Sequence, residues 1–487
     1  MINTRDSADR RTYPELCTEP VVQDTTPGIR LKGQKERQLL MYRCKVSSMR
    51  IKLLVSILIV VFHAIGHAQG SMHNKVVLIS LDGLGADSLR DPDLPAPTIK
   101  ELMKQGTYAE AMQPINPTIT WPNHTAMLTG FNAGQLHLVV NGLVTGQREQ
   151  RIIKVDTKQP RSRMFSALTL YDVAHAHGLS TAEVDWVAIK DAEHIDWSFP
   201  EHPSPGGTME LELMRNGILT HEELERFAHP SQAWRDRIYT RAAVAILRNH
   251  HPDLMLIHLL ALDTVEHQTG VNNDAMRNTI AFLDDRVKEI VEAVHDDGDL
   301  ERTTFVLVSD HGQQNAHYQL HADVLLHDMP KYGEDMEQEA RCLADGGFAM
   351  IYQKNATQFS LKDLQTFWQH QKGIRAALTP EEARVDGWPV PEDTMQAPDL
   401  LLYALDDYDF SGATGQEYIT TSGQHGAHGY PNTNPGMQAV FIASGRGIRA
   451  HGKVPAFSNL QIASTIAEIL GIPEKAFPGD PIKAILQ

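Results

Sequence analysis

The sequence predicts an α/β protein with a largely parallel central sheet. Three apolar runs carry this prediction, at residues 76–81, 254–260 and 305–309. Runs of this length, bounded by glycine or polar residues, are typical of buried parallel strands. Each run leads toward acidic residues, and side chains just past parallel strands gather at one edge of a sheet. Residues far apart in the sequence are therefore expected to converge there.

Helix and strand signals alternate along the rest of the chain. Further strands are predicted at residues 109–112, 180–187, 399–405 and 438–442. Helices are predicted at residues 96–105, 125–128, 166–177, 234–249, 273–295 and 460–470. Residues 313–420 are charged and interrupted by glycine and proline, which predicts an inserted cap. The catalytic domain would then consist of residues 74–312 and 421–487.

Charge and composition narrow the class of protein. The chain has 487 residues and a formal charge of −17, although its first 52 residues hold an excess of basic side chains. An acidic surface argues against binding a nucleic acid polymer or an anionic membrane. It does not exclude phosphate substrates, because bound divalent metals would dominate the field of a site. Oligomeric state has no signal in the sequence.

The beginning of the chain has the pattern of an export signal. Residues 49–68 contain a basic start, a short apolar run at 53–62 and small residues before a potential cleavage point. The apolar run is far shorter than the ~20 residues of a membrane span. We expect a cleaved signal peptide here and a periplasmic or secreted protein. Residues 1–48 would be a disordered leader or an over-extended reading frame.

Six potential metal ligands fall into four separated clusters, the first three of which follow predicted strands: Asp82, Asp263 with His267, Asp310 with His311, and His428. This mixture of carboxylates and imidazoles suits zinc, with manganese, cobalt or iron as alternatives. Two such ions can hold the attacking and leaving oxygens of a displacement at phosphorus. The pattern therefore predicts a site with two divalent metal ions that breaks phosphate esters.

Thr120 is the candidate nucleophile. Its hydroxyl would become nucleophilic at neutral pH only beside a metal ion, and it would then form a phosphothreonine intermediate. Pro122 and Asn123 favour a tight turn into a helix, whose free N–H groups would attract an anionic phosphate. A single aspartate of this kind is more often a cap or turn residue, and a single histidine is more often a core or surface residue. Thr120 alone could equally be a strand or cap hydroxyl. The prediction depends on all these positions occurring together.

Five motifs resemble the nucleotide pyrophosphatase/phosphodiesterase branch of the alkaline phosphatase superfamily. They are residues 81–83, residues 120–124, Asp263 with His267, residues 309–312 and residues 426–430. The resemblance implies an alkaline-phosphatase-like three-layer sandwich with an inserted cap. It further implies that one zinc is held by Asp263, His267 and His428, and the other by Asp82, Thr120, Asp310 and His311.

The resemblance also implies a role for one further residue, and three residues of this chain differ from the family's motifs. Asn141 resembles the family's asparagine that binds a non-bridging phosphate oxygen, although it could equally be a turn residue before glycine. Glu266, Gln313 and Pro431 stand where the family often has glycine, methionine and aspartate. None of these changes removes a ligand. His425 competes with His428 as a ligand, but His428 fits the phase of the motif.

The leading hypothesis is an exported zinc-dependent phosphodiesterase or nucleotide pyrophosphatase that acts on a small phosphate ester or nucleotide. A phosphomonoesterase or phosphonate hydrolase of the same superfamily is the nearest alternative. Monoester specialists usually need an extra cation, and no arginine can be assigned to that role. A non-catalytic exported metal-binding protein would be indicated by a lost ligand or nucleophile. All seven positions are present.

Overall fold

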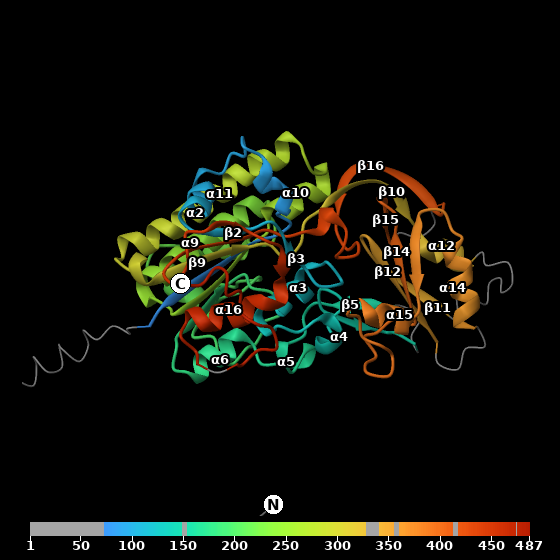
Figure 1. Cartoon of the computed structure of the whole chain (residues 1–487), viewed down its shortest axis with the longest axis horizontal. Coiled ribbons are helices and arrows are strands. Elements are labelled where there is room, and N and C mark those ends of the chain that lie inside the picture. The colour runs from blue at the N-terminus through green and yellow to red at the C-terminus, as the bar shows by residue number, and fades with distance from the viewer. Residues whose placement is uncertain (1–72, 149–152, 328–339, 355–359, 413–416, 474) are drawn as a thin grey trace, which may run out of the picture. The chain divides into compact units, whose positions relative to one another are not determined.

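An eight-stranded sheet forms the core of the structure, a computed structural model (Figure 1). The order of its strands is β18 (Gly452–Val454), β2 (Thr107–Ala109), β17 (Phe441–Gly445), β9 (Thr303–Val308), β1 (Lys75–Leu81), β8 (Leu254–Leu259), β6 (Thr181–Val184) and β7 (Trp197–Phe199). The strands from β9 to β7 pair in parallel, and β17 is antiparallel to both of its neighbours. The predicted α/β class with a largely parallel sheet is confirmed.

The structure describes residues 73–148, 153–327, 340–354, 360–412, 417–473 and 475–487. The predicted leader and signal peptide, residues 1–48 and 49–68, lie outside this part of the chain. All the elements below belong to the unit formed by residues 73–487. No helix in the described part is both long and apolar enough to cross a membrane.

Alternation along the strands builds a core on each face of the sheet. In β1, Val77, Ile79 and Leu81 pack on one face, and Val76 and Leu78 pack on the other. Every residue of β1 is buried, as expected for a strand covered on both faces. The predicted run at 76–81 is therefore a central strand because it can bury apolar side chains in both directions.

Helices cover both faces, which gives the three layers that the resemblance implied. The helices on one face are α2 (Pro97–Gln105), α7 (Thr208–Arg215), α8 (His221–Glu225), α9 (Gln232–His250), α10 (Ala261–Thr269) and α11 (Asp274–Asp296). Those on the other face are α3 (Thr120–Thr129), α6 (Leu170–Ala176) and α16 (Ile462–Ile469). Figure 1 shows α2, α9 and α11 on one side of the sheet and α6 and α16 on the other.

Two smaller sheets are formed by strands that come after β9 in the chain. One contains β15 (Asp407–Phe410), β10 (Gln314–Leu320) and β16 (Ile419–Ala427). The other contains β11 (Ala340–Asp345), β12 (Phe348–Gln353), β14 (Leu400–Ala404) and β13 (Ile374–Leu378). They are accompanied by α12 (Ala322–His327), α14 (Leu361–Gln369) and α15 (Pro380–Val385). These elements occupy most of the segment for which we predict a cap, and that role stays a prediction.

Minor elements complete the described chain. Short helices are α4 (Ala133–Leu136), α5 (Arg161–Met164), η1 (Ala86–Arg90), η2 (Leu300–Arg302), η4 (Pro435–Met437) and η5 (Asn459–Gln461). Short strand pairs are β3 (Met112–Gln113) with β19 (Phe457–Ser458), and β4 (Leu143–Thr145) with β5 (Lys154–Asp156). The strand predicted at 109–112 is thus divided between β2 and β3.

Candidate active site

The predicted metal ligands lie at the ends of strands, as the sequence pattern indicated. Asp82 follows β1 directly, and the Asp310–His311 pair comes two residues after β9. Asp263 and His267 lie on α10, which begins just after β8. Because β1 pairs with both β8 and β9, the carboxyl ends of these three strands are neighbours. Parallel pairing therefore brings together residues separated by more than 200 positions.

Asp263, His267 and His428 form the first ligand group, with one potential ligand atom from each lying within 4.8 Å of the others. The Nε2 atoms of His267 and His428 lie 3.3 and 3.8 Å from Asp263 Oδ1. Each ring is oriented through its other nitrogen. His267 Nδ1 lies 3.0 Å from the carbonyl oxygen of Gly426, and His428 Nδ1 lies 3.2 Å from that of Thr118. Such backbone contacts leave Nε2 free to bind a metal ion.

A second group lies beside the first. Asp82, Asp263 and His311 also bring one ligand atom each within 4.8 Å of one another, so Asp263 belongs to both groups. His311 Nε2 lies 3.1 Å from Asp310 Oδ2 and 3.6 Å from Asp82 Oδ1. All three of these atoms are buried and have no hydrogen-bond partner among the described residues. Three buried polar atoms without such partners, 3.1 and 3.6 Å from His311 Nε2 in the case of the two oxygens, fit the donor set of a metal site.

The electrostatics of this cluster fit divalent cations. Burial and the neighbouring charge of Asp310 raise the pKa of Asp82 well above 3.8. Burial lowers the pKa of His311 to about 4. Within the described part of the chain, the ion-pair partners of these aspartates are histidines, not lysine or arginine. Buried carboxylates without a counter-charge are costly, and a metal ion would supply that charge through the nitrogen and oxygen ligands that zinc prefers.

Thr120 is the first residue of α3 and is 8% exposed. Its own backbone carbonyl oxygen lies 2.9 Å from Nδ1 of His124, which in turn lies 3.7 Å from Asp310 Oδ2. Through Thr118 the same segment contacts His428 of the first group. The beginning of α3 therefore contacts one residue from each set of predicted ligands.

The local structure here differs from the expectation of a turn at Pro122 and Asn123 with a helix near 125. The helix already begins at Thr120, so both residues lie in its first turn. Proline is tolerated there because N–H groups in the first turn have no acceptor within the helix. The side chain of Asn123 joins the helix to the preceding loop, accepting from the N–H of Ile115 and donating to the carbonyl oxygens of Pro117 and Ile119.

Asn141 lies beside this helix terminus. Its Oδ1 accepts a hydrogen bond of 2.8 Å from the backbone N–H of Trp121, the residue after Thr120. With the oxygen engaged by the helix, the Nδ2 amide group is the part of Asn141 that can contact a ligand. Asn141 thus contacts the residue next to the candidate nucleophile, and its role as a phosphate ligand stays a prediction.

Several polar residues that sequence reasoning passed over support the ligands. His258 Nε2 lies 3.0 Å from Asp82 Oδ2. Asp236 on α9 accepts from the N–H groups of Leu260 and Ala261 at the beginning of α10, which carries Asp263. The sequence offered a signal for His258, because it is a histidine within the apolar run 254–260. Asp236 carried none, because only the packing of α9 against α10 shows what it caps.

Two of the three residues that depart from the family pattern, Gln313 and Glu266, lie close to the ligands. Gln313 Nε2 donates to Asp263 Oδ1 at 2.6 Å and to the backbone carbonyl oxygen of Asp263 at 3.2 Å. Glu266 is 1% exposed, and its Oε2 has no hydrogen-bond partner in the described part of the chain. His425, the competing ligand candidate, is directed elsewhere, since its Nε2 pairs with Asp409 Oδ1 at 3.0 Å.

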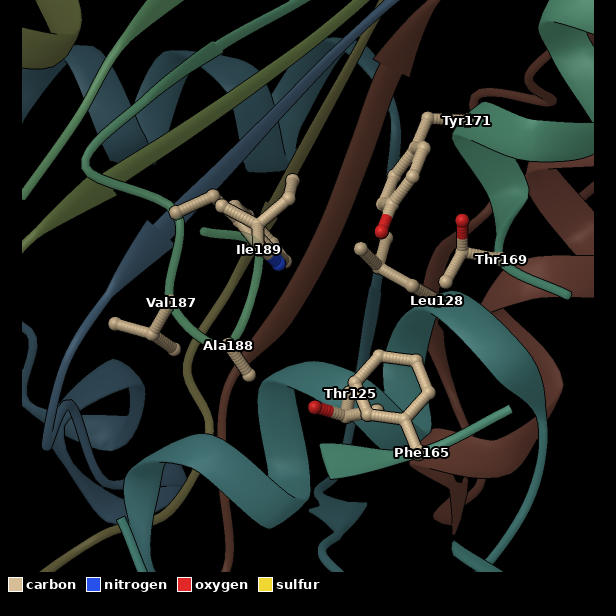
Figure 2. A pocket seen from close by; sticks show the side chains of 9 residues that line it. Thr125, Leu128, Phe165, Thr169, Tyr171, Val187, Ala188 and Ile189 are labelled. Carbon is tan, nitrogen blue, oxygen red and sulfur yellow. The ribbon is translucent and has the colours of Figure 1, made fainter. Parts of the chain in front are cut away.

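A small cavity is lined in part by Thr125 and Leu128 of α3 (Figure 2). Thr125, Tyr171 and Trp186 are among its lining residues, and their side-chain polar atoms have no hydrogen-bond partner among the described residues. Its volume of about 10 Å³ has room for roughly one water molecule. This cavity is too small for a phosphate ester, so it is not the substrate site.

Comparisons with known proteins identify the family of this chain. Residues 76–431 match the family model described as type I phosphodiesterase/nucleotide pyrophosphatase. A venom phosphodiesterase of Naja atra is 20% identical over 411 residues, which cover 82% of this chain and 45% of that protein. Human ectonucleotide pyrophosphatase/phosphodiesterase family member 7 is 22% identical over 420 residues, covering 85% of this chain and 83% of that protein. The chain spans about half the length of the snake-venom relatives that it matches.

Solved structures show the same fold. Murine ectonucleotide pyrophosphatase/phosphodiesterase 5, in an inactive form in complex with AMP, superposes with a TM-score of 0.65 at 15% identity. The match covers 85% of this chain and 100% of that chain. The human counterpart gives the same TM-score at 16% identity.

Proposed function

The chain belongs to the type I phosphodiesterase/nucleotide pyrophosphatase family, and from this premise we propose that it is an exported, metal-dependent hydrolase of phosphodiesters or nucleotide pyrophosphates. Its substrate would be a small phosphate ester or nucleotide, and no nucleic acid polymer is expected. The complex of a murine relative with AMP supports a nucleotide. The names of the venom relatives support export, and residues 49–68 would supply the signal.

Two divalent ions, zinc by preference, would be held by two sets of ligands. Asp263, His267 and His428 would bind one ion, and Asp82, Thr120, Asp310 and His311 the other. The observation that carries this proposal is the proximity of ligand atoms: Asp263, His267 and His428 each offer an atom within 4.8 Å of the others, and so do Asp82, Asp263 and His311. Bound there, the ions would supply positive charge that lowers the pKa of the attacking hydroxyl and stabilises the leaving oxygen.

The protein's own residues would perform the remaining steps. Thr120 Oγ attacks the phosphorus atom, a bond forms between them, and the bond from phosphorus to the leaving alcohol or phosphate oxygen breaks. The Nδ2 group of Asn141 binds a non-bridging oxygen of the phosphoryl group. Water then attacks the phosphothreonine intermediate, which releases the second product and restores the threonine. His267, whose side chain is 41% exposed, lies on the side of the site that is open to solvent.

Replacing the nucleophile tests this proposal. We expect Thr120→Ala to lose at least about 10³-fold in kcat with little change in the free energy of unfolding, because it removes a nucleophile but leaves six other ligands. Thr129→Ala is the matched control, since it removes a buried hydroxyl from the same helix. Hydrolysis of a p-nitrophenyl nucleotide diester is the assay. Near-normal turnover by Thr120→Ala would contradict the covalent step.

Metal removal tests the cofactor independently. EDTA should inactivate the protein, and added zinc should restore activity, with two equivalents bound by elemental analysis. Initial rates on a p-nitrophenyl monoester and on the diester would separate the diesterase from the phosphomonoesterase alternative. A folded protein that binds no transition metal offered in excess would refute the proposal.

A further inference from the structure

His258 is a buried histidine in the centre of an apolar strand. It lies on β8 between Ile257 and Leu259, opposite Ser80 of β1, and is 1% exposed. Burying an imidazole costs free energy unless its nitrogens find partners. An aliphatic side chain would fill this position of the strand without that cost. The partners of the two ring nitrogens therefore indicate what the residue does.

Both nitrogens of His258 face oxygen atoms of aspartates. Nε2 lies 3.0 Å from Asp82 Oδ2 and donates to it whenever Nε2 carries a hydrogen. Nδ1 lies 3.0 Å from the backbone carbonyl oxygen of Asp185 and 3.5 Å from its Oδ2. The other oxygen of Asp82, Oδ1, has no hydrogen-bond partner in the described chain and faces His311 at 3.6 Å. His258 thus engages one oxygen of Asp82 and leaves the other directed into the cluster.

The turn after β6 brings Asp185 to this histidine in a strained conformation. Asp185 and Ala188 have φ angles of 58° and 56°, the left-handed region that side chains other than glycine rarely adopt. Alanine is strained in this region, aspartate less so, and strain of this kind clusters at functional sites. Trp186 of the same turn packs edge-on against His124, which also packs edge-on against His258. The turn therefore braces His258 both by its backbone and through a neighbouring ring.

We propose that His258, braced by the turn at Asp185, is a positioning residue that orients the Asp82 carboxylate so that Oδ1 binds a metal ion. It contacts neither substrate nor metal itself, and it acts through Asp82. The inference rests on the proposed function, since it assumes that Asp82 is a metal ligand. It adds a residue of this chain that the five motifs do not contain.

Zinc affinity measured on the metal-free protein, by competition with a chromophoric chelator, tests the proposal without any turnover. His258→Phe should weaken one of the two zinc equivalents about 10- to 100-fold and leave the other within about threefold, as expected for the loss of a residue that orients a ligand. His258→Gln should restore most of the lost affinity, because its amide nitrogen can replace Nε2 as the donor to Asp82. His321→Phe is the control, a buried histidine that pairs with Thr420 instead of a ligand.

The outcomes separate the two claims. If the unsubstituted protein binds fewer than two zinc ions, the proposed two-metal site fails. If it binds two and His258→Phe binds both with unchanged affinity, or weakens both equally, only the positioning role is overturned. If the phenylalanine variant does not fold, His258→Gln and His258→Asn decide, since asparagine replaces only Nδ1. Equal zinc affinities of these two variants would then refute the role of Nε2.

Discussion

Glu183, a buried carboxyl in the central sheet, allows a quantitative test of how burial makes the stability of the protein depend on pH. It lies on β6 and is 1% exposed. Its Oε2 accepts from the backbone N–H of Trp186 at 3.0 Å, and its Oε1 contacts the hydroxyl of Ser198. Burial raises the pKa of this carboxyl from 4.5 to about 8. Glu183→Gln imitates the protonated form, because one amide atom can accept from Trp186 while the other donates to Ser198.

The sign follows from the proton balance of the two states. Between pH 4.5 and 8 the folded chain keeps a proton on Glu183 that the unfolded chain has released, so raising the pH through this window lowers the free energy of unfolding. The complete loss corresponds to about 5 kcal/mol, of which about 4 kcal/mol falls between pH 5 and pH 9. Glutamine is neutral throughout. From pH 5 to pH 9, the free energy of unfolding of the variant should therefore rise by about 4 kcal/mol relative to that of the unsubstituted protein.

Urea unfolding at pH 5 and pH 9, with EDTA present in both proteins, measures this difference. EDTA removes metal binding from the comparison, and other titrating groups cancel between the two proteins to a first approximation. Glu381→Gln is the control, because Glu381 is exposed. A Glu183→Gln variant whose stability falls with pH as steeply as that of the unsubstituted protein would refute the argument from burial.

Three further substitutions test the supports of the candidate site. Asp236→Ala should lower the free energy of unfolding by about 2–3 kcal/mol in urea titrations, because the first N–H groups of α10 lose their buried acceptor. Gly83→Ala should be destabilising and should weaken zinc binding, since Gly83 has φ +79° and an added Cβ would lie 3.2 Å from Asp263 Cα. Gly178→Ala, at φ +77° with nothing within 4 Å, should cost strain alone and leave zinc affinity unchanged. Gln313→Met should lower zinc affinity about tenfold in chelator competition, and unchanged affinity would show that its 2.6 Å hydrogen bond does not orient the carboxylate.

Periodicity predicted the core strands well because burial on both faces leaves a continuous apolar run. β1, β8 and β9 lie where the runs at 76–81, 254–260 and 305–309 placed them. The predicted bounds of short elements were less accurate. The helix predicted at 166–177 spans only Leu170–Ala176, because Thr169 caps it at a later position. Local pattern could not show that Thr120 itself begins α3.

The positions of the candidate ligands were readable from the sequence because polar residues stand out at the ends of apolar runs. The sequence could not show that Asp263 lies between two groups of ligands, or that His258, Gln313 and Asp236 hold those groups in place. These contacts join residues on different strands and helices.

By itself, the amino-acid sequence determined the α/β class, the central strands and the polar residues at their carboxyl ends, because each can be recognised from the local order of apolar and polar residues. Tertiary structure alone decided which atoms face one another. Distances within the cluster depend on how β1, β8 and β9 pair and on where α3 and α10 begin, and these are set by packing across the whole sheet.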